Sequence, residues 1–269
     1  WDGLEWLYAR LAVDDDLAVP AAVPLGILER LAALGVPRFD LDLQGGARGR
    51  VTLFYVERAL HALARRQGDD GRWDEDDRVS WLVLGTFVGA GYTFRGRHPF
   101  AQVVSRALAG LRDRPVPDPR VAALRAAVLV RLQAMAPADR LWEPTARALA
   151  ELRTRWRDAS DDALATAFAA MAVAYREEVS PPIDAAFADE LRAACRRLAG
   201  RGDDLALAAG AAGAVLLGDD AESVLWRARL AALVERLEEA PRSDPYLFWF
   251  AESATLRCRG EPFKTWRDW

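Results

Sequence analysis

Apolar residues recur along most of the chain at the three- and four-residue spacing of a helix with one buried face. In segment 220–238, for example, one such stripe runs through Trp226, Leu230, Leu233 and Leu237. Short breaks rich in glycine, proline and aspartate separate the periodic segments. The pattern predicts about twelve helices, at 3–12, 20–35, 51–67, 78–92, 99–113, 118–135, 140–156, 160–178, 182–200, 203–217, 220–238 and 244–258.

Two kinds of predicted helix alternate in the second half of the chain. Segments 160–178 and 203–217 are apolar on almost every side, which predicts burial all round. Segments 140–156, 182–200 and 220–238 carry arginine and glutamate on one face, which predicts contact with water. Because short loops make consecutive helices antiparallel neighbours, we expect an all-α fold, an α/α toroid. It is a double ring of about six helical hairpins, with the small-residue helices as its inner wall.

The first 50 residues are the least regular part of the chain. Residues 39–44 alternate apolar and polar side chains and lead into Gly45 and Gly46, a pattern typical of a short strand and a turn. This strand is either a surface connection or an edge that accepts a partner strand or covers the ring. We therefore assign irregular N-terminal helices and a short strand to 1–50, within the same domain as the toroid at 51–269.

Composition and charge narrow the classes of partner. The 269 residues carry a net charge of -4 with acids and bases interspersed, which disfavours a nucleic-acid partner. No apolar run approaches the roughly 20 residues needed to cross a bilayer, so we predict a soluble domain without a transmembrane segment. The chain begins at Trp1, so we expect part of a longer protein, with tethering through an upstream segment left open. Abundant alanine and arginine beside scarce lysine and isoleucine suggest a bacterial source.

Cysteine and histidine are too few for a disulfide framework or an evident metal site. The chain has only Cys195 and Cys258, and only His61 and His98. No spacing places a histidine beside a cysteine, so we predict neither a metal nor another cofactor.

One run of residues after segment 51–67 has a recognisable order. Its members are Leu63, Gln67, Gly71 and Trp73, in the spacing Leu-x3-Gln-x3-Gly-x-Trp. The run resembles the Gln-Trp repeat of the terpenoid cyclase and protein prenyltransferase α/α-toroid superfamily. Residues 81–93, and residues 244–251 with Trp266, are similar to helices of its squalene-cyclase-like, prenyltransferase and squalene oxidase repeat proteins. The resemblance implies an α/α toroid and a degenerate member with one good copy of the repeat.

The Gln-Trp motif has a structural use. Gln67 at a helix end is able to hydrogen-bond carbonyls that lack a helical partner, and Trp73 is able to pack over the loop. Gly71 gives the turn its conformational freedom. We therefore expect Gln67, Gly71 and Trp73 to be scaffold residues.

The same resemblance implies a candidate acid. The cyclases that the chain resembles carry Asp-x-Asp-Asp, whose middle aspartate protonates the polyene; Asp161 and Asp162 match its last two positions. Ala159 stands at the first position, and Asp158 lies one residue before it. A second interpretation is that these aspartates cap a helix, with Ser160 as the N-cap, because Asp-Asp pairs also precede other predicted helices.

Two further groups are candidates for ligand binding. Arg95, Arg97 and His98 lie in one loop and would hold a diphosphate or a carboxylate, or would simply be solvated. Aromatic side chains at helical spacing would line a cavity or fill the core. Among them we single out Phe168, Tyr175, Tyr246 and Trp249 as candidate ligand contacts.

Two functions remain open. The first is a non-catalytic interaction domain that binds an apolar small molecule or a protein segment. The second is a class II terpenoid-cyclase-like enzyme, of the isomerase or lyase type, with Asp161 as general acid. The single ring that 269 residues allow favours the first, since the cyclases it resembles generally add a second helical domain.

Overall fold

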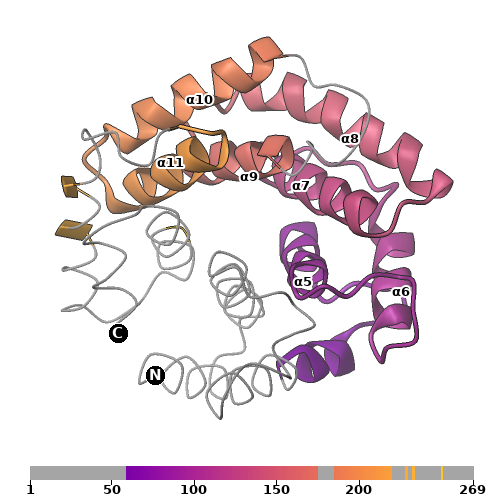
Figure 1. Ribbon diagram of the computed structural model, residues 1–269. Coiled ribbons are helices and arrows are strands. Elements are labelled where there is room, and N and C mark those ends of the chain that lie inside the picture. The colour runs from indigo at the N-terminus through magenta and orange to yellow at the C-terminus, as the bar shows by residue number, and fades with distance from the viewer. Residues whose placement is uncertain (1–58, 175–184, 220–227, 230–231, 234–249, 251–269) are drawn as a thin grey trace, which may run out of the picture. The chain divides into compact units, whose positions relative to one another are not determined.

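The computed structural model describes residues 59–174 and 185–219, together with 228–229, 232–233 and 250 (Figure 1). Within this part of the chain every regular element is a helix and no strand occurs, which confirms the all-α prediction for it. The labelled helices in these ranges are α5 (Asp77–Gly89), α6 (Ala101–Leu111), α7 (Pro119–Met135), α8 (Asp139–Arg157), α9 (Ala163–Ala174), α10 (Ala185–Ala199) and α11 (Asp204–Leu216).

These bounds agree with the seven corresponding predicted segments to within a few residues. The predicted elements at 1–50, including the strand at 39–44, lie outside the described residues, and segment 51–67 is seen as helix only over 59–66. Closure of the hairpins into a ring therefore stays a prediction. None of the helices in the described residues combines the length and the apolar character that a bilayer crossing requires.

The chain divides into two compact units, 1–113 with 269, and 114–268. We call them the N-terminal and C-terminal units and describe each by itself. In the N-terminal unit α5 packs against α6. Helix α5 is buried on nearly every side, whereas α6 buries a single stripe. Phe87 of α5 contacts both the loop before α5 and the start of α6. Its ring stacks on Trp73 of that loop and lies 5.3 Å from the ring of Phe100, the residue that precedes α6.

The C-terminal unit repeats the same alternation over five helices. Helix α7 packs against α9, and α9 packs against α11, so these three form one layer. All three are buried nearly all round, and α8 and α10 lie over them with a single apolar face (Figure 1). The predicted alternation of fully and partly buried helices is therefore present in this unit.

Helices α10 and α11 approach each other unusually closely. A Cβ added to Gly210 would lie 2.5 Å from the backbone nitrogen of Ala199, and one added to Gly213 would lie 2.6 Å from Cys195 Sγ. The Cys195 thiol is buried in this contact, and burial raises its pKa to about 12. The two glycines thus set how near the helices can lie.

Each buried helix begins at an aspartate. Asp76, Asp118, Asp162 and Asp203 precede α5, α7, α9 and α11, and each accepts a backbone N–H from the first turn of its helix. Their positions are 42, 44 and 41 residues apart. The residues before α6 and α8, Phe100 and Ala138, provide no such side-chain bond. The repeating element of the described chain is therefore a helical hairpin whose buried member is capped by aspartate.

Candidate functional site

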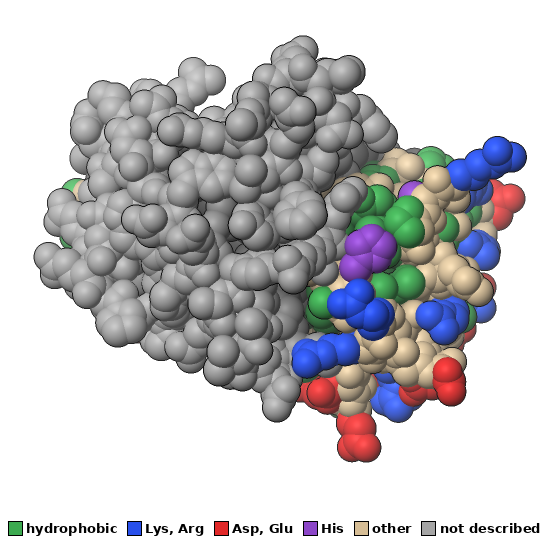
Figure 2. Space-filling model, turned by 90° about the horizontal axis from the view of Figure 1, so that it is seen from below, with side chains coloured by type: hydrophobic (Ala, Val, Ile, Leu, Met, Phe, Trp, Pro, Cys, Tyr) green, Lys and Arg blue, Asp and Glu red, His purple; other side chains and the backbone are tan. Residues whose placement is uncertain are grey.

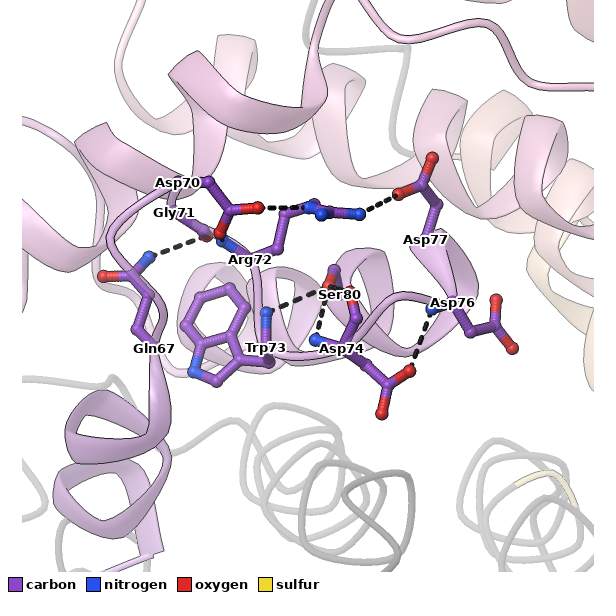
Figure 3. Close-up of polar contacts among 9 residues, drawn as sticks. All are labelled: Gln67, Asp70, Gly71, Arg72, Trp73, Asp74, Asp76, Asp77 and Ser80. Atoms are coloured by element: carbon purple, nitrogen blue, oxygen red, sulfur yellow. Dashed lines mark hydrogen bonds and ion pairs between the residues drawn. The ribbon is translucent and has the colours of Figure 1, made fainter.

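The loop at residues 67–73, which we call the Gln-Trp loop, connects a helix end to the next hairpin (Figure 3). Gln67 Nε2 donates to the carbonyl of Gly71 at 3.0 Å and to that of Val103 in α6 at 2.9 Å. Gly71 has φ 84°, and a Cβ on it would lie 2.7 Å from the Arg106 carbonyl carbon and closer still to the carbonyl oxygen. The loop therefore lies directly on the backbone of α6, which only glycine at this position permits.

Trp73 completes this fastening. Its indole Nε1 donates to the carbonyl of Leu63 at 2.7 Å, and its ring stacks on Phe87 with centroids 5.8 Å apart. Its backbone N–H donates to Ser80 Oγ at 3.1 Å, which ties the loop to the first turn of α5. Each of these contacts is internal to the N-terminal unit, as a scaffold role requires.

Charged side chains on this loop are paired as well. Arg72 Nε donates to Asp70 Oδ2 at 2.6 Å, and Arg72 Nη1 lies 3.7 Å from Asp77 Oδ1 (Figure 3). The hydrogen bond from the Arg72 side chain, with a second one from its backbone, lowers the pKa of Asp70. Arg72 therefore binds Asp70 within the loop and lies near Asp77 at the start of α5.

The aspartates of the candidate acid motif hold the start of α9. Asp162 Oδ1 accepts the N–H of Ala165 at 2.8 Å, and Asp162 Oδ2 accepts both Nε and Nη2 of Arg120 at 2.8 and 2.6 Å. The expected N-cap Ser160 is therefore wrong, and Asp162 fills that place. Ser160 instead offers its carbonyl to Thr166 Oγ1.

Asp161 and Asp158 face other surroundings. The side chain of Asp161 is 78% exposed and pairs with Arg201 at 2.7 Å, while Asp158 is the C-cap residue of α8. A carboxylic acid that protonates an alkene needs a dry, aromatic-walled pocket and support from a second carboxylate. Asp161 is instead largely exposed and paired with an arginine. The arrangement is well suited to stabilising a helix start.

Arginines fasten the segments before the buried helices, a feature that sequence reasoning missed. In each case a guanidinium donates to a backbone carbonyl one to four residues before a capping aspartate. The pairs are Arg155 with Pro117 at 3.1 Å, Arg201 with Asp161 at 2.7 Å, and Arg229 with Ala199 at 2.6 Å and with Arg201. The donor lies 28–40 residues further along the chain than the acceptor. We call these contacts the arginine clamps.

The predicted anion-binding residues sit in a tightly bonded turn after α5. Thr93 Oγ1 accepts the backbone N–H of Arg95 at 3.1 Å, and Gly96 has φ 103°. His98 Nδ1 accepts the N–H of Phe100 at 3.2 Å, and His98 Nε2 lies 3.1 Å from the Arg95 carbonyl. Both contacts are satisfied together when the proton is on Nε2. The turn, residues 93–98, is thus held by bonds within itself.

In the part of the chain that the structure describes, no acidic side chain pairs with the guanidinium groups of this turn. Arg95 and Arg97 are exposed, and neither forms an ion pair among the residues that the structure describes. The Arg95 guanidinium lies 5.7 Å from the centroid of the Phe94 ring, within cation–π range. Figure 2 shows a face on which histidine, arginine and hydrophobic side chains lie beside one another in the described part.

The candidate aromatic contacts are described only in part. Phe168 is 2% exposed and packs against Phe250 with centroids 5.8 Å apart, so it leaves little surface for a ligand. Tyr175, Tyr246 and Trp249 lie outside the described residues. Within the described ranges, no group of three or more histidine, cysteine or acidic side chains is arranged to hold a metal ion.

Comparison of the chain with protein-family models, with curated proteins and with solved structures finds no match.

Proposed function

We propose that this chain is a non-catalytic, degenerate helical ring of the terpenoid-cyclase type, acting as a binding domain for an apolar ligand or a protein segment. The state of the candidate acid carries the proposal. Asp161 is exposed and paired with Arg201, and its neighbour Asp162 is occupied by the first turn of α9 and by Arg120. Both carboxylates thus serve the scaffold, and neither is placed for proton transfer to an apolar substrate.

The proposal of a ring rests on the repeated helical hairpins as well as on the Gln-Trp motif. Aspartate-capped buried helices follow one another every 41–44 residues, and each partly buried helix covers them from one side. Continued at this spacing over 269 residues, the hairpins number about six, as the double ring requires. The small side chains of α9 and α11 suit an inner wall, where helices converge.

The decisive experiment separates binding from turnover. The purified chain is incubated with squalene, farnesyl diphosphate or geranylgeranyl diphosphate, separated from free ligand by gel filtration, and extracted for mass spectrometry. We expect retained squalene to be recovered unchanged, and no cyclised product from any of the three compounds.

The matched variants are Asp161→Asn and, as a control on another exposed aspartate, Asp69→Asn. We expect both to behave as the wild type. A cyclised product that wild type and Asp69→Asn form and Asp161→Asn does not would replace this proposal by the alternative, a class II cyclase with Asp161 as general acid.

A further inference from the structure

Charge is unevenly distributed along the chain around the turn at 93–98. Residues 78–112 contain five arginines and no aspartate or glutamate, although the whole chain has a net charge of -4. Arg95, Arg97 and His98 lie near the middle of this stretch. The turn therefore has no acidic neighbour in sequence within fourteen residues on either side.

Most other arginines of the described chain are engaged by carboxylates or carbonyls. Arg120 binds Asp162, and Arg196 binds both oxygens of Asp219 at 2.7 and 2.6 Å. Arg95 and Arg97 are exposed and form no ion pair among the described residues, as is also true of Arg65 and Arg197, but Arg95 and Arg97 lie two residues apart on one turn. The turn therefore presents two exposed guanidinium groups close together, as a ligand with two carboxylates requires.

The turn holds its arginines on a fixed backbone. Thr93, His98 and the left-handed Gly96 restrain it through the contacts given above. The rings of Tyr92 and His98 lie 5.1 Å apart, and both side chains are only half-buried. Fixing the backbone in advance lowers the entropy lost when a ligand binds.

We propose that the turn at 93–98 is a docking point for an acidic segment of a partner protein. Arg95 and Arg97 would bind two carboxylates, and the half-buried rings of Tyr92 and Phe94 would contact an apolar side chain between them. Charge complementarity selects this occupant: the guanidinium groups stand exposed on a surface turn, which an extended acidic chain can lie along. The inference rests on the proposed binding function and specifies one class of partner.

The test uses a fluorescein-labelled synthetic peptide that alternates glutamate with leucine, and a matched peptide that alternates glutamine with leucine. Binding is followed by fluorescence anisotropy. We expect the glutamate peptide to bind, with an affinity that falls as salt is raised, and the glutamine peptide not to bind. Removing both guanidinium groups in Arg95→Gln/Arg97→Gln should weaken binding several-fold, up to about thirtyfold, since each exposed ion pair contributes up to about 1 kcal/mol.

Two variants keep the result interpretable. Arg65→Gln/Arg197→Gln removes the same charge from two other exposed arginines that form no ion pair among the described residues, and should bind within about twofold of wild type. Gly96→Ala keeps both arginines but strains a residue with φ 103°, and should bind several times more weakly. Circular dichroism confirms that each variant is folded.

Several outcomes would overturn the inference. Equal loss in both double variants would show unspecific charge attraction, and wild-type affinity in Gly96→Ala would show that the fixed turn plays no part. Binding of phosphatidylserine vesicles or inorganic phosphate, without binding of the glutamate peptide, would assign the arginines to another ligand. None of these affects the squalene experiment, so failure here is distinguishable from failure of the proposed function.

Discussion

The starts of α5 and α9 are held by different means, although both helices are buried and both are capped by an aspartate. Before α5, Gln67 and Trp73 of the loop that leads into it bind carbonyls of the preceding helix end, of the loop and of α6. Before α9, Arg120 reaches in from the first turn of α7, and Arg201 from the loop between α10 and α11. The first start is fastened by a local motif and the second by distant guanidinium groups.

One detail is shared by the two starts. A hydroxyl lies four residues after each cap, at Ser80 and Thr166, and each accepts an N–H from a tryptophan. In α5 the donor is the backbone of Trp73, and in α9 it is the indole of Trp156 at 3.0 Å. In both places a tryptophan N–H thus binds a hydroxyl in the first turn of a buried helix, from a loop residue before α5 and from the last turn of α8 before α9.

The largest expected effect tests the close packing of the C-terminal unit. Burial raises the pKa of the Cys195 thiol from 9.0 to about 12, so at about pH 8 the folded state holds roughly a thousandfold less thiolate. In a Cys258→Ser background we expect dithionitrobenzoate to label Cys195 at least about a thousandfold more slowly in native protein than in urea. Comparable rates in the two conditions would contradict the tight contact of α10 with α11.

The same group predicts a pH dependence of stability. Above about pH 9 the unfolded state loses the Cys195 thiol proton while the folded state keeps it. The contribution of this thiol to the free energy of unfolding is therefore complete below about pH 9 and is lost as pH rises toward about 12. Cys195→Ala should remove this part of the alkaline decline. Urea unfolding at several pH values, with Cys258→Ser as the matched control, measures it.

The next largest effect tests the Gln-Trp loop. Gly71→Ala places a methyl group against the Arg106 carbonyl at φ 84°, and we expect it to lower the free energy of unfolding by about 3 kcal/mol or more. Gly218 has φ 83° but open space around it. Gly218→Ala should therefore lower the free energy of unfolding by about 1 kcal/mol, from backbone strain alone. Gly202→Ala, with open space and no positive φ, serves as control. Similar losses in all three would contradict the close approach to α6.

A smaller loss is expected when the amide of the motif is removed. Gln67→Leu leaves the carbonyls of Gly71 and Val103 without their donor, which should cost about 2 kcal/mol. Gln102→Leu, an exposed glutamine on α6, should change stability by less than about 0.5 kcal/mol. Equal effects in thermal unfolding would show that Gln67 contributes only as an ordinary helix-end residue.

The smallest effect separates the two adjacent aspartates of α9. Asp162→Ala removes the N-cap acceptor and should cost about 1 kcal/mol, whereas Asp161→Ala removes only an exposed ion pair and should cost less than about 0.5 kcal/mol. Asp162→Asn keeps an acceptor oxygen and should recover most of the loss. The reverse order in urea unfolding would contradict the assignment of Asp162 as the N-cap of α9.

The helices and the Gln-Trp motif were predictable because their determinants are local. Apolar spacing located α5 to α11, since burial repeats with the helical turn, and Gln67, Gly71 and Trp73 lie within seven residues of one another. The arginine clamps were not predictable, because the acceptor is a main-chain oxygen 28–40 residues away and carries no side-chain signal. The cap was assigned to the wrong residue, since Ser160 and Asp162 are equally good N-caps by type.

The choice of main-chain oxygens as acceptors in the clamps has a consequence for tolerance to substitution. Every amino acid supplies the same peptide carbonyl, so replacing Pro117 or Ala199 by another residue of compatible backbone conformation leaves the Arg155 and Arg229 attachments chemically intact. Loops joined in this way are free to diverge in side chain while the hairpins they connect stay in place. Attachment through main-chain oxygens therefore lets the fold persist while the side chains of its sequence motifs are substituted.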